Sequence, residues 1–123
     1  MENNQINRVS RLVCSLALLP LLAGCAAPTL YTWGHYQDVI YTTYDKPGKV
    51  PPERQVELLE QDYQKARATN KRMCPGFHAQ LGYLYYDLGK LDQARQEFAT
   101  EKADFPESAV FMDRLLANLD KKP

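Results

Sequence analysis

Apolar side chains recur at helical spacing in five segments of the chain, and proline- or glycine-rich breaks separate these segments. The clearest pattern covers residues 52–70, after a proline- and glycine-rich loop at residues 45–52. Its apolar face carries Val56, Leu59, Tyr63 and Ala66. Pro52 suits the first position of a helix, because the backbone nitrogen there needs no partner within the helix. The sequence therefore predicts a helix that begins at this proline.

Three further helices are predicted after residue 74. The first opens at Pro75 and ends at Gly89, the second covers residues 91–103, and the third follows Pro106 with Ser108 as its N-cap. The inward positions are Phe77, Leu81, Leu84, Tyr85 and Leu88 in the first, Ala94 and Phe98 in the second, and Phe111, Met112, Leu115, Leu116 and Leu119 in the third. The fold class predicted from this pattern is all-α.

Residues 30–44 are unusually aromatic, and their pattern allows two interpretations. Trp33, Tyr36, Ile40 and Tyr44 share one face of a helix. The tyrosine and threonine content of the same segment also permits a strand. We expect the helix, with the strand as the alternative.

Residues 75–108 resemble a tetratricopeptide repeat, a 34-residue unit of two packed helices. The matching positions are Leu81, Gly82, Tyr85, Ala94, Phe98 and Pro106, while His78 replaces the usual tryptophan and Glu101 replaces a small residue. A glycine inside a helix costs about 1 kcal/mol relative to alanine, so Gly82 indicates a close contact between the two helices. The flanking segments look like weaker copies. We therefore expect a short array of about two repeats and a capping helix over residues 33–123.

The start of the chain has the order of parts found in a secretory signal. Arg8 and Arg11 precede an apolar stretch at residues 12–22, which is too short to span a bilayer. The run Leu22-Ala23-Gly24-Cys25 that follows resembles the lipobox of bacterial lipoproteins. This resemblance implies cleavage after residue 24, diacylglycerol and an N-acyl chain on Cys25, and a lipidated tether at residues 25–32. It also implies an outer-membrane anchor on the periplasmic face, because Ala26 replaces the aspartate of inner-membrane retention.

Charge and cysteine content then narrow the possible functions. Without the signal the chain keeps 13 basic and 14 acidic side chains, so it lacks the basic surface that nucleic-acid binding requires. Cys74 is the one cysteine left for the folded part, so no internal disulfide can form. Its place beside Pro75, at a predicted helix start, favours burial or a capping position, and pairing with another molecule is the alternative. Cys74 and His78 together supply only two metal ligands, and we predict no metal, no cofactor beyond the acyl chains and no small-molecule substrate.

The sequence shows no set of residues typical of an enzyme. Ser10 and Ser15 leave with the signal, and Ser108 is predicted to cap a helix. Cys74 and His78 lie one helical turn apart, but no third residue is placed to orient them. His35 is expected on the surface or in packing contacts. We therefore predict a protein without catalytic activity.

Repeat arrays of this type bind peptides or proteins on a concave surface formed mainly by the first helix of each pair. The repeat register assigns to that surface Asp38, Tyr41, Ala79, Tyr83, Tyr86, Asp87 and Asp113. Tyrosines supply contact area with a polar tip, and the aspartates favour a partner that carries lysine or arginine. The alternative is that the tyrosines are ordinary half-exposed residues and the aspartates only keep the protein soluble.

The segment Trp33-Gly34-His35-Tyr36, together with residues 41–47, resembles a small proteobacterial family of outer-membrane lipoproteins, the domain of unknown function 4810. Members of that family tend to be encoded beside a lipoprotein resembling the curli secretion channel. The resemblance therefore implies an envelope-protein partner, with such a channel-like lipoprotein as one candidate. We predict an anchored adaptor in envelope or secretion-complex assembly. A structural subunit of a larger envelope machine and a regulator of a cell-wall enzyme remain the alternatives.

Overall fold

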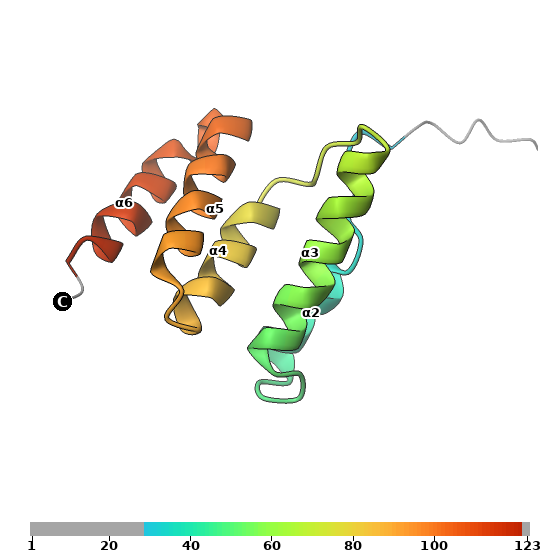
Figure 1. Ribbon diagram of the computed structural model, residues 1–123, viewed down its shortest axis with the longest axis horizontal. Helices are drawn as coiled ribbons and strands as arrows, with labels where there is room; N and C mark the ends of the chain where they lie inside the picture. The colour runs from blue at the N-terminus through green and yellow to red at the C-terminus, as the bar shows by residue number, and fades with distance from the viewer. Residues whose placement is uncertain (1–28, 122–123) are drawn as a thin grey trace, which may run out of the picture.

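The computed structural model describes residues 29–121, and these residues form an all-α fold, as predicted. The helices are α2 (Tyr36–Asp45), α3 (Pro52–Ala68), α4 (Phe77–Asp87), α5 (Leu91–Asp104) and α6 (Ala109–Leu119), with the short 3-10 helix η2 (Pro106–Ser108) before α6. Helices α3 to α6 follow one another across the molecule, and α2 lies behind α3 (Figure 1). The strand alternative for residues 30–44 is wrong, because most of this segment is helix α2.

Helix α3 begins and ends where its sequence favours it. Pro52 occupies the first turn after Pro51 in an extended conformation, and Glu53 complements the positive helix end. Lys65 and Arg67 lie in the last turn, where they complement the negative end. The chain then leaves the helix through Asn70, which has a φ of 52°.

Helices α4 and α5 form the most closely packed pair. A Cβ atom built on Gly82 would lie 2.6 Å from the Phe98 ring and 3.2 Å from the carbonyl oxygen of Ala94. A glycine is therefore the only residue that permits this approach without a shift, and the predicted close contact is confirmed. Between the two helices Gly89 adopts a φ of 72°, a conformation that suits glycine and ends α4.

Glu101 of α5 caps the start of α4 from the side. Its buried carboxylate accepts hydrogen bonds from the backbone N–H groups of Gly76 (2.7 Å), His78 (3.1 Å) and Ala79 (3.3 Å). The first N–H groups of a helix have no partner within it, and a negative charge there is favoured by the helix dipole. This explains why a glutamate stands where the repeat pattern usually has a small residue.

The segment before α2 is joined to the connection between α3 and α4. Thr32 donates its backbone N–H to the carbonyl of Arg72 (2.8 Å) and accepts from the N–H of Cys74 (3.1 Å). These bonds form an isolated parallel bridge between Thr32 and Met73, and residues 29–121 contain no strand. The start of the described chain is thereby fixed to the middle of the array.

Two polar contacts hold α2 and its preceding turn against α3. Asp62 of α3 accepts from the backbone N–H of His35 (2.6 Å) and contacts the imidazole Nδ1 (2.9 Å). Gly34, with a φ of 48°, makes room for this carboxylate, because a Cβ there would overlap Asp62. Farther along α2, the Thr43 hydroxyl donates to the side-chain oxygen of Gln55 (2.9 Å). His35, expected on the surface or in packing contacts, is half-buried and is held by the Asp62 carboxylate.

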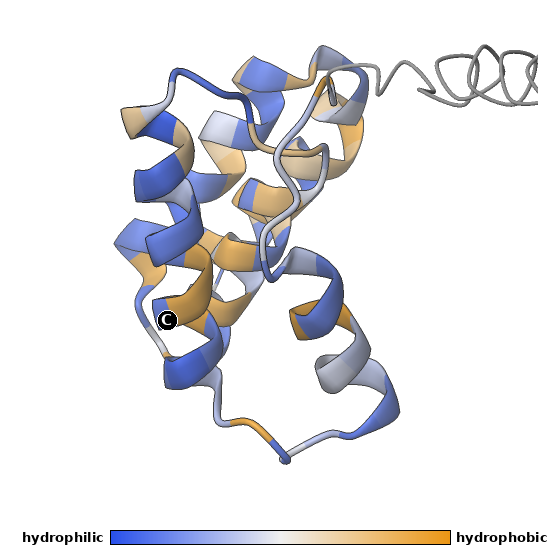
Figure 2. Ribbon diagram, turned by 90° about the vertical axis from the view of Figure 1, so that its right-hand side faces the viewer, coloured by the Kyte–Doolittle hydropathy of each residue, from blue (hydrophilic) through white to orange (hydrophobic). Residues whose placement is uncertain are grey.

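The apolar faces of the first and last helices differ from those predicted. In the first segment Trp33 lies before the helix, Tyr44 is 73% exposed, and Val39 is the residue that α2 buries. Figure 2, viewed from the side of α2 and α3, shows that orange, the colour of apolar residues, is limited to a short stretch of α2. In α6 the buried residues are Met112 and Leu119, whereas Phe111 is 58% exposed.

Ser108 stands at the predicted N-cap position of α6, but its side chain does not cap the helix. Its hydroxyl donates back to the carbonyl of Phe105 (2.7 Å) and makes no capping bond to α6, because residues 106–108 form a 3-10 turn instead. None of the helices within residues 29–121 combines the length and the apolar character needed to cross a membrane.

Candidate functional site

The residues predicted to line the concave surface lie on three helices, and two of these residues line the same pocket. Tyr83 and Tyr86 of α4 line a small cavity beside α6. Asp38 lines a different cavity, of about 230 Å³, together with His35 and Val39. The structure therefore joins only the tyrosine part of the predicted surface.

The other four predicted residues have separate surroundings. The exposed Tyr41 ring lies 5.7 Å from the Lys46 ammonium, and a hydrogen bond to Asp45 is the main cause that raises the pKa of Tyr41. Ala79 is half-buried against the core, and Asp87 is exposed at the end of α4. Asp113 contacts Lys102 of α5 at 2.6 Å, so its charge is paired toward α5.

The tyrosine pocket lies between α4 and α6, above the Phe98 ring of α5. It has a volume of about 160 Å³, and α6 contributes Leu115, Asn118 and Leu119 to its wall. Tyr83 is 46% exposed at this pocket, whereas Tyr86 is half-buried and packs against the core. Helical periodicity predicts these leucines as core residues and gives no sign that they also line an opening.

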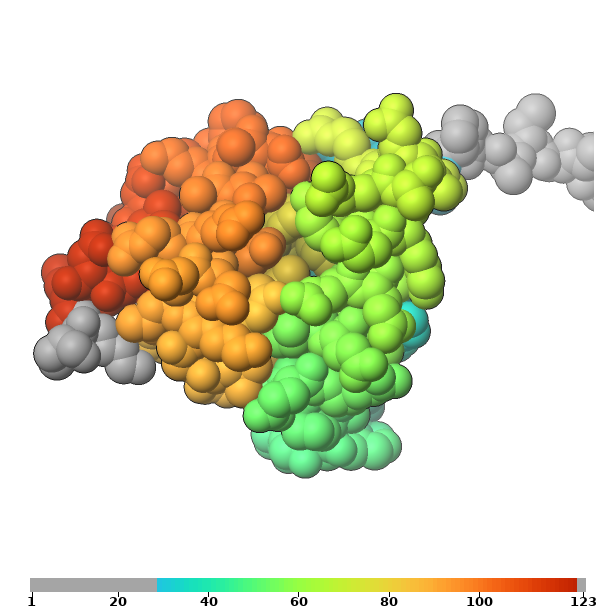
Figure 3. All heavy atoms as spheres, viewed as in Figure 1, coloured from blue at the N-terminus to red at the C-terminus, as the bar shows by residue number. Residues whose placement is uncertain are grey.

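A larger cleft opens on the other side of α4, between α3 and α5. In Figure 3 the orange atoms of α5 and the green atoms of α3 flank recessed yellow atoms of α4. The cleft has a volume of about 530 Å³. Its lining consists of Glu57, Glu60, Gln61, Tyr63, Gln64, Lys65, Leu81, Tyr85 and Glu97. Three carboxylates and one lysine make the cleft acidic, a feature that the scattered acidic residues do not reveal in the sequence.

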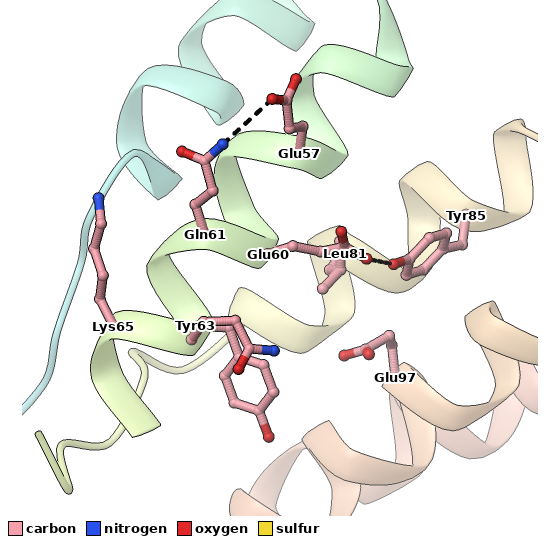
Figure 4. Close-up of a pocket in the computed structure, with 9 residues that line it drawn as sticks. Glu57, Glu60, Gln61, Tyr63, Lys65, Leu81, Tyr85 and Glu97 are labelled. Atoms are coloured by element: carbon pink, nitrogen blue, oxygen red, sulfur yellow. Dashed lines mark hydrogen bonds between the residues drawn. The ribbon is translucent and has the colours of Figure 1, made fainter. Parts of the chain in front are cut away.

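The carboxylates of this cleft already have partners in the protein. The Tyr85 hydroxyl donates to Glu60, and the Gln61 amide donates to Glu57 at 3.3 Å (Figure 4). Glu97, which points into the cleft from α5, lies 2.6 Å from Nδ1 of His78. These contacts hold the acidic groups on fixed sides of the cleft.

Tyr85 is held in its protonated form. Burial raises its pKa above the usual value of a tyrosine, and the hydrogen bond to Glu60 and the nearby charges of Glu60 and Glu97 raise it further. A protonated phenol is a hydrogen-bond donor and a weak nucleophile.

Cys74 and His78 do not form a nucleophile and base. Both side chains are fully buried, and burial raises the pKa of the Cys74 thiol to about 11. The reactive form of a cysteine is the thiolate, which such a pKa disfavours. The His78 ring instead contacts Glu97 and packs edge-on against Tyr63, with ring centres 5.0 Å apart. The predicted burial of Cys74 is confirmed.

The structure describes the candidate metal ligands but does not extend to the candidate lipidation site. Among the residues that the structure describes, no three histidine, cysteine or acidic side chains gather as a group that could hold a metal ion. Cys25 and the signal segment lie outside the described residues, so their predicted roles rest on the sequence.

The comparisons with known proteins identify the family of this chain. The model of the family described as a domain of unknown function (DUF4810) matches residues 30–115, and the chain belongs to this family. The match spans all of α2 to α5 and most of α6. No curated protein matches the chain. No solved structure matches it either.

Proposed function

We propose that this protein is a lipid-anchored adaptor of the outer membrane, facing the periplasm, that docks a partner protein through the pocket between α4 and α6. The observation that carries the proposal is the exposed Tyr83 beside an apolar pocket. The lipobox at residues 22–25 supports the anchor, and the tetratricopeptide-like pattern at residues 75–108 supports a binding role. The proposed function needs no catalytic residue.

The size of the pocket favours a protein partner. Small-molecule sites typically have volumes of about 300–1,000 Å³. The α4–α6 pocket, at about 160 Å³, is smaller and suits one apolar side chain of a partner. Partially exposed aromatic residues beside such a pocket are typical anchors of protein interfaces. Tyr83 supplies this aromatic contact.

The charge near the pocket favours a partner with basic residues. Asp87 lies one helical turn after Tyr83 and is exposed. Asp113 contributes less, because Lys102 already neutralises it. An apolar side chain that enters the pocket, next to a lysine or arginine that reaches Asp87, is the partner chemistry that we propose.

The test is in-cell cross-linking of the full lipoprotein, followed by identification of the captured proteins. Tyr83→Ala removes the aromatic contact without touching a fully buried residue, and Tyr41→Ala on α2 is the matched control, since Tyr41 is also exposed. We expect Tyr83→Ala to lose a distinct envelope protein that the wild type and Tyr41→Ala both capture. An unchanged set of captured proteins in the Tyr83→Ala variant would contradict the proposed pocket.

A structural subunit of a larger envelope machine is the second candidate, and α2 provides its observation. Tyr41 and Tyr44 are 57% and 73% exposed on this helix, which is unusual for two neighbouring aromatic residues. In the same experiment, loss of capture by Tyr41→Ala but not by Tyr83→Ala would favour this role. Native electrophoresis would then show a large assembly that the Tyr41→Ala variant fails to join.

A further inference from the structure

We propose that the C-terminal end of α3, together with the first residues of the described chain, lies directly on the surface of an anionic phospholipid membrane. This inference rests on the proposed lipid anchor at Cys25. It goes beyond that anchor, because it assigns one surface of the folded part to the lipid headgroups and so fixes how the array is oriented.

The connection between the described chain and the proposed anchor is short. The described chain begins at Thr29, four residues after Cys25. A fully extended chain covers at most about 3.6 Å per residue, so these residues span roughly 14 Å. The surface where the described chain begins must therefore lie close to the lipid headgroups.

The start of the described chain is fixed to the rest of the fold. Thr32 forms two backbone hydrogen bonds with the connection after α3, as described above. The Arg72 guanidinium lies 5.9 Å from the centre of the Tyr31 ring and 5.5 Å from that of Phe105, and it donates to the carbonyl of Asp104 at 3.1 Å. Because Tyr31 and Arg72 hold the chain in place, the short tether brings one particular end of the array to the membrane.

The C-terminal end of α3, beside which the described chain begins, is basic. The basic residues at the end of α3 and just after it are Lys65, Arg67, Lys71 and Arg72, and all four are exposed. The sequence contains no acidic residue between Asp62 and Asp87. Asp62, the preceding acid in the sequence, is buried and contacts His35 and Lys65. Asp104 of α5, whose carbonyl accepts from Arg72, is one exposed acid at this end, against four exposed basic residues. Clustered basic residues are attracted to anionic headgroups over about one Debye length.

The opposite charge lies at the other end of the same helix. The first half of α3 carries Glu53, Glu57 and Glu60, all exposed, and one basic residue, Arg54, which pairs with Glu57. With 17 residues α3 is about 25 Å long, so the acidic half is well separated from the basic end. An anionic surface therefore attracts the basic end of α3 more strongly than the other end, which selects an orientation.

Exposed apolar residues adjoin the basic end. Leu30 is 78% exposed, and Trp33, the single tryptophan of the chain, is 44% exposed. Tryptophan is favoured at membrane–water interfaces because its ring is amphipathic. Figure 1 shows the described chain beginning beside the upper end of α3. Thr32, which lies between Leu30 and Trp33 in the sequence, is bonded to the backbone of Arg72, so this segment adjoins the basic group.

Trp33 makes the proposal testable by fluorescence. The full lipidated protein is reconstituted into vesicles of phosphatidylcholine, with or without phosphatidylglycerol, and both vesicle types contain bromine-labelled acyl chains that quench tryptophan on contact. We expect quenching of Trp33 to be about twofold stronger with phosphatidylglycerol, because the headgroup charge draws the basic end to the surface. Raising the salt from about 0.1 M to 1 M shortens the Debye length to about 3 Å and should abolish the difference.

Two matched double variants test whether the basic end of α3, and not any exposed lysine pair, contacts the membrane surface. Lys65→Gln with Lys71→Gln removes two basic charges at the proposed surface, whereas Lys46→Gln with Lys49→Gln removes two exposed charges from the loop between α2 and α3. We expect the first pair to lose the additional quenching and the second to keep it. Equal quenching of the wild type in both vesicle types would overturn the proposed membrane-facing surface. An equal loss of the additional quenching in both double variants would overturn it as well. Flotation with the vesicles tests the anchor separately, and wild-type protein that fails to float would overturn the anchor and this inference with it.

Discussion

The α4–α5 pair and helix α2 are held in the fold by different forces. Helix α4 buries seven of its residues, and α5 packs against it through Ala94 and Phe98. Helix α2 buries only Val39 and packs Tyr36 against the core, and the hydrogen bonds of Asp62 and Gln55 add to this small apolar contact. Close apolar packing resists local opening more than a few partly exposed polar contacts do. The comparison therefore indicates a stable α4–α5 pair and a helix α2 that separates more easily from the rest of the described fold.

The largest expected effect comes from Gly82→Leu, which would break the close contact of α4 and α5. The added side chain must displace the Phe98 ring, and the Ala94 carbonyl leaves little space for it to turn away. We expect the free energy of unfolding to fall by about 3 kcal/mol. Urea denaturation followed by circular dichroism measures this change, and a midpoint equal to that of the wild type would contradict the packing described for this pair.

A smaller loss is expected from Glu101→Ala, which removes the cap on α4 while leaving the apolar contacts. Three backbone N–H groups of residues 76, 78 and 79 would lose their acceptor inside the protein. We expect a loss of about 2 kcal/mol in the free energy of unfolding. Glu101→Gln keeps one acceptor oxygen and should lose less. If the alanine and glutamine variants were both as stable as the wild type, the cap would not contribute to stability.

The smallest effect on global stability is expected at α2, where the change should stay local. Gly34→Ala places a methyl group against the Asp62 carboxylate and requires a left-handed backbone at an alanine. This conformation alone costs about 1 kcal/mol, so together with the overlap against Asp62 the opening equilibrium should change by at least roughly fivefold. Hydrogen exchange should show faster exchange in residues 36–45, with α4 and α5 unchanged. Equally faster exchange in all helices would show that α2 does not open independently.

The two regions also differ in how far the sequence predicts them. The positions of α3 to α5 and the contact at Gly82 are predicted correctly, because apolar periodicity and a glycine within a helix directly reflect packing. The partner of His35 is not predictable in this way. Asp62 lies 27 residues away, and a single hydrogen-bonded pair leaves no periodic signal.

The wrongly predicted burial in α6, the last helix described, has a related cause. The period of α6 gives a broad apolar face that includes Phe111, yet only Met112 and Leu119 are buried. Because no further helix packs on α6 within the described residues, one side of this face is left open. The same absence leaves Leu115 at the wall of the α4–α6 pocket. The sequence thus predicted Tyr83 and Tyr86 as surface residues but could not predict the side chains that enclose the pocket beside them.

The most direct test of the proposed adaptor role is a photo-reactive benzoylphenylalanine in place of Tyr83 in the full lipoprotein, activated in living cells. Asn118, on the opposite wall of the pocket, is the second position to label, and Tyr44 on α2 is the control. The account predicts that the labels at residues 83 and 118 capture the same envelope protein and that the label at residue 44 does not. Capture of that protein from residue 44 alone would contradict the account and move the interface to α2.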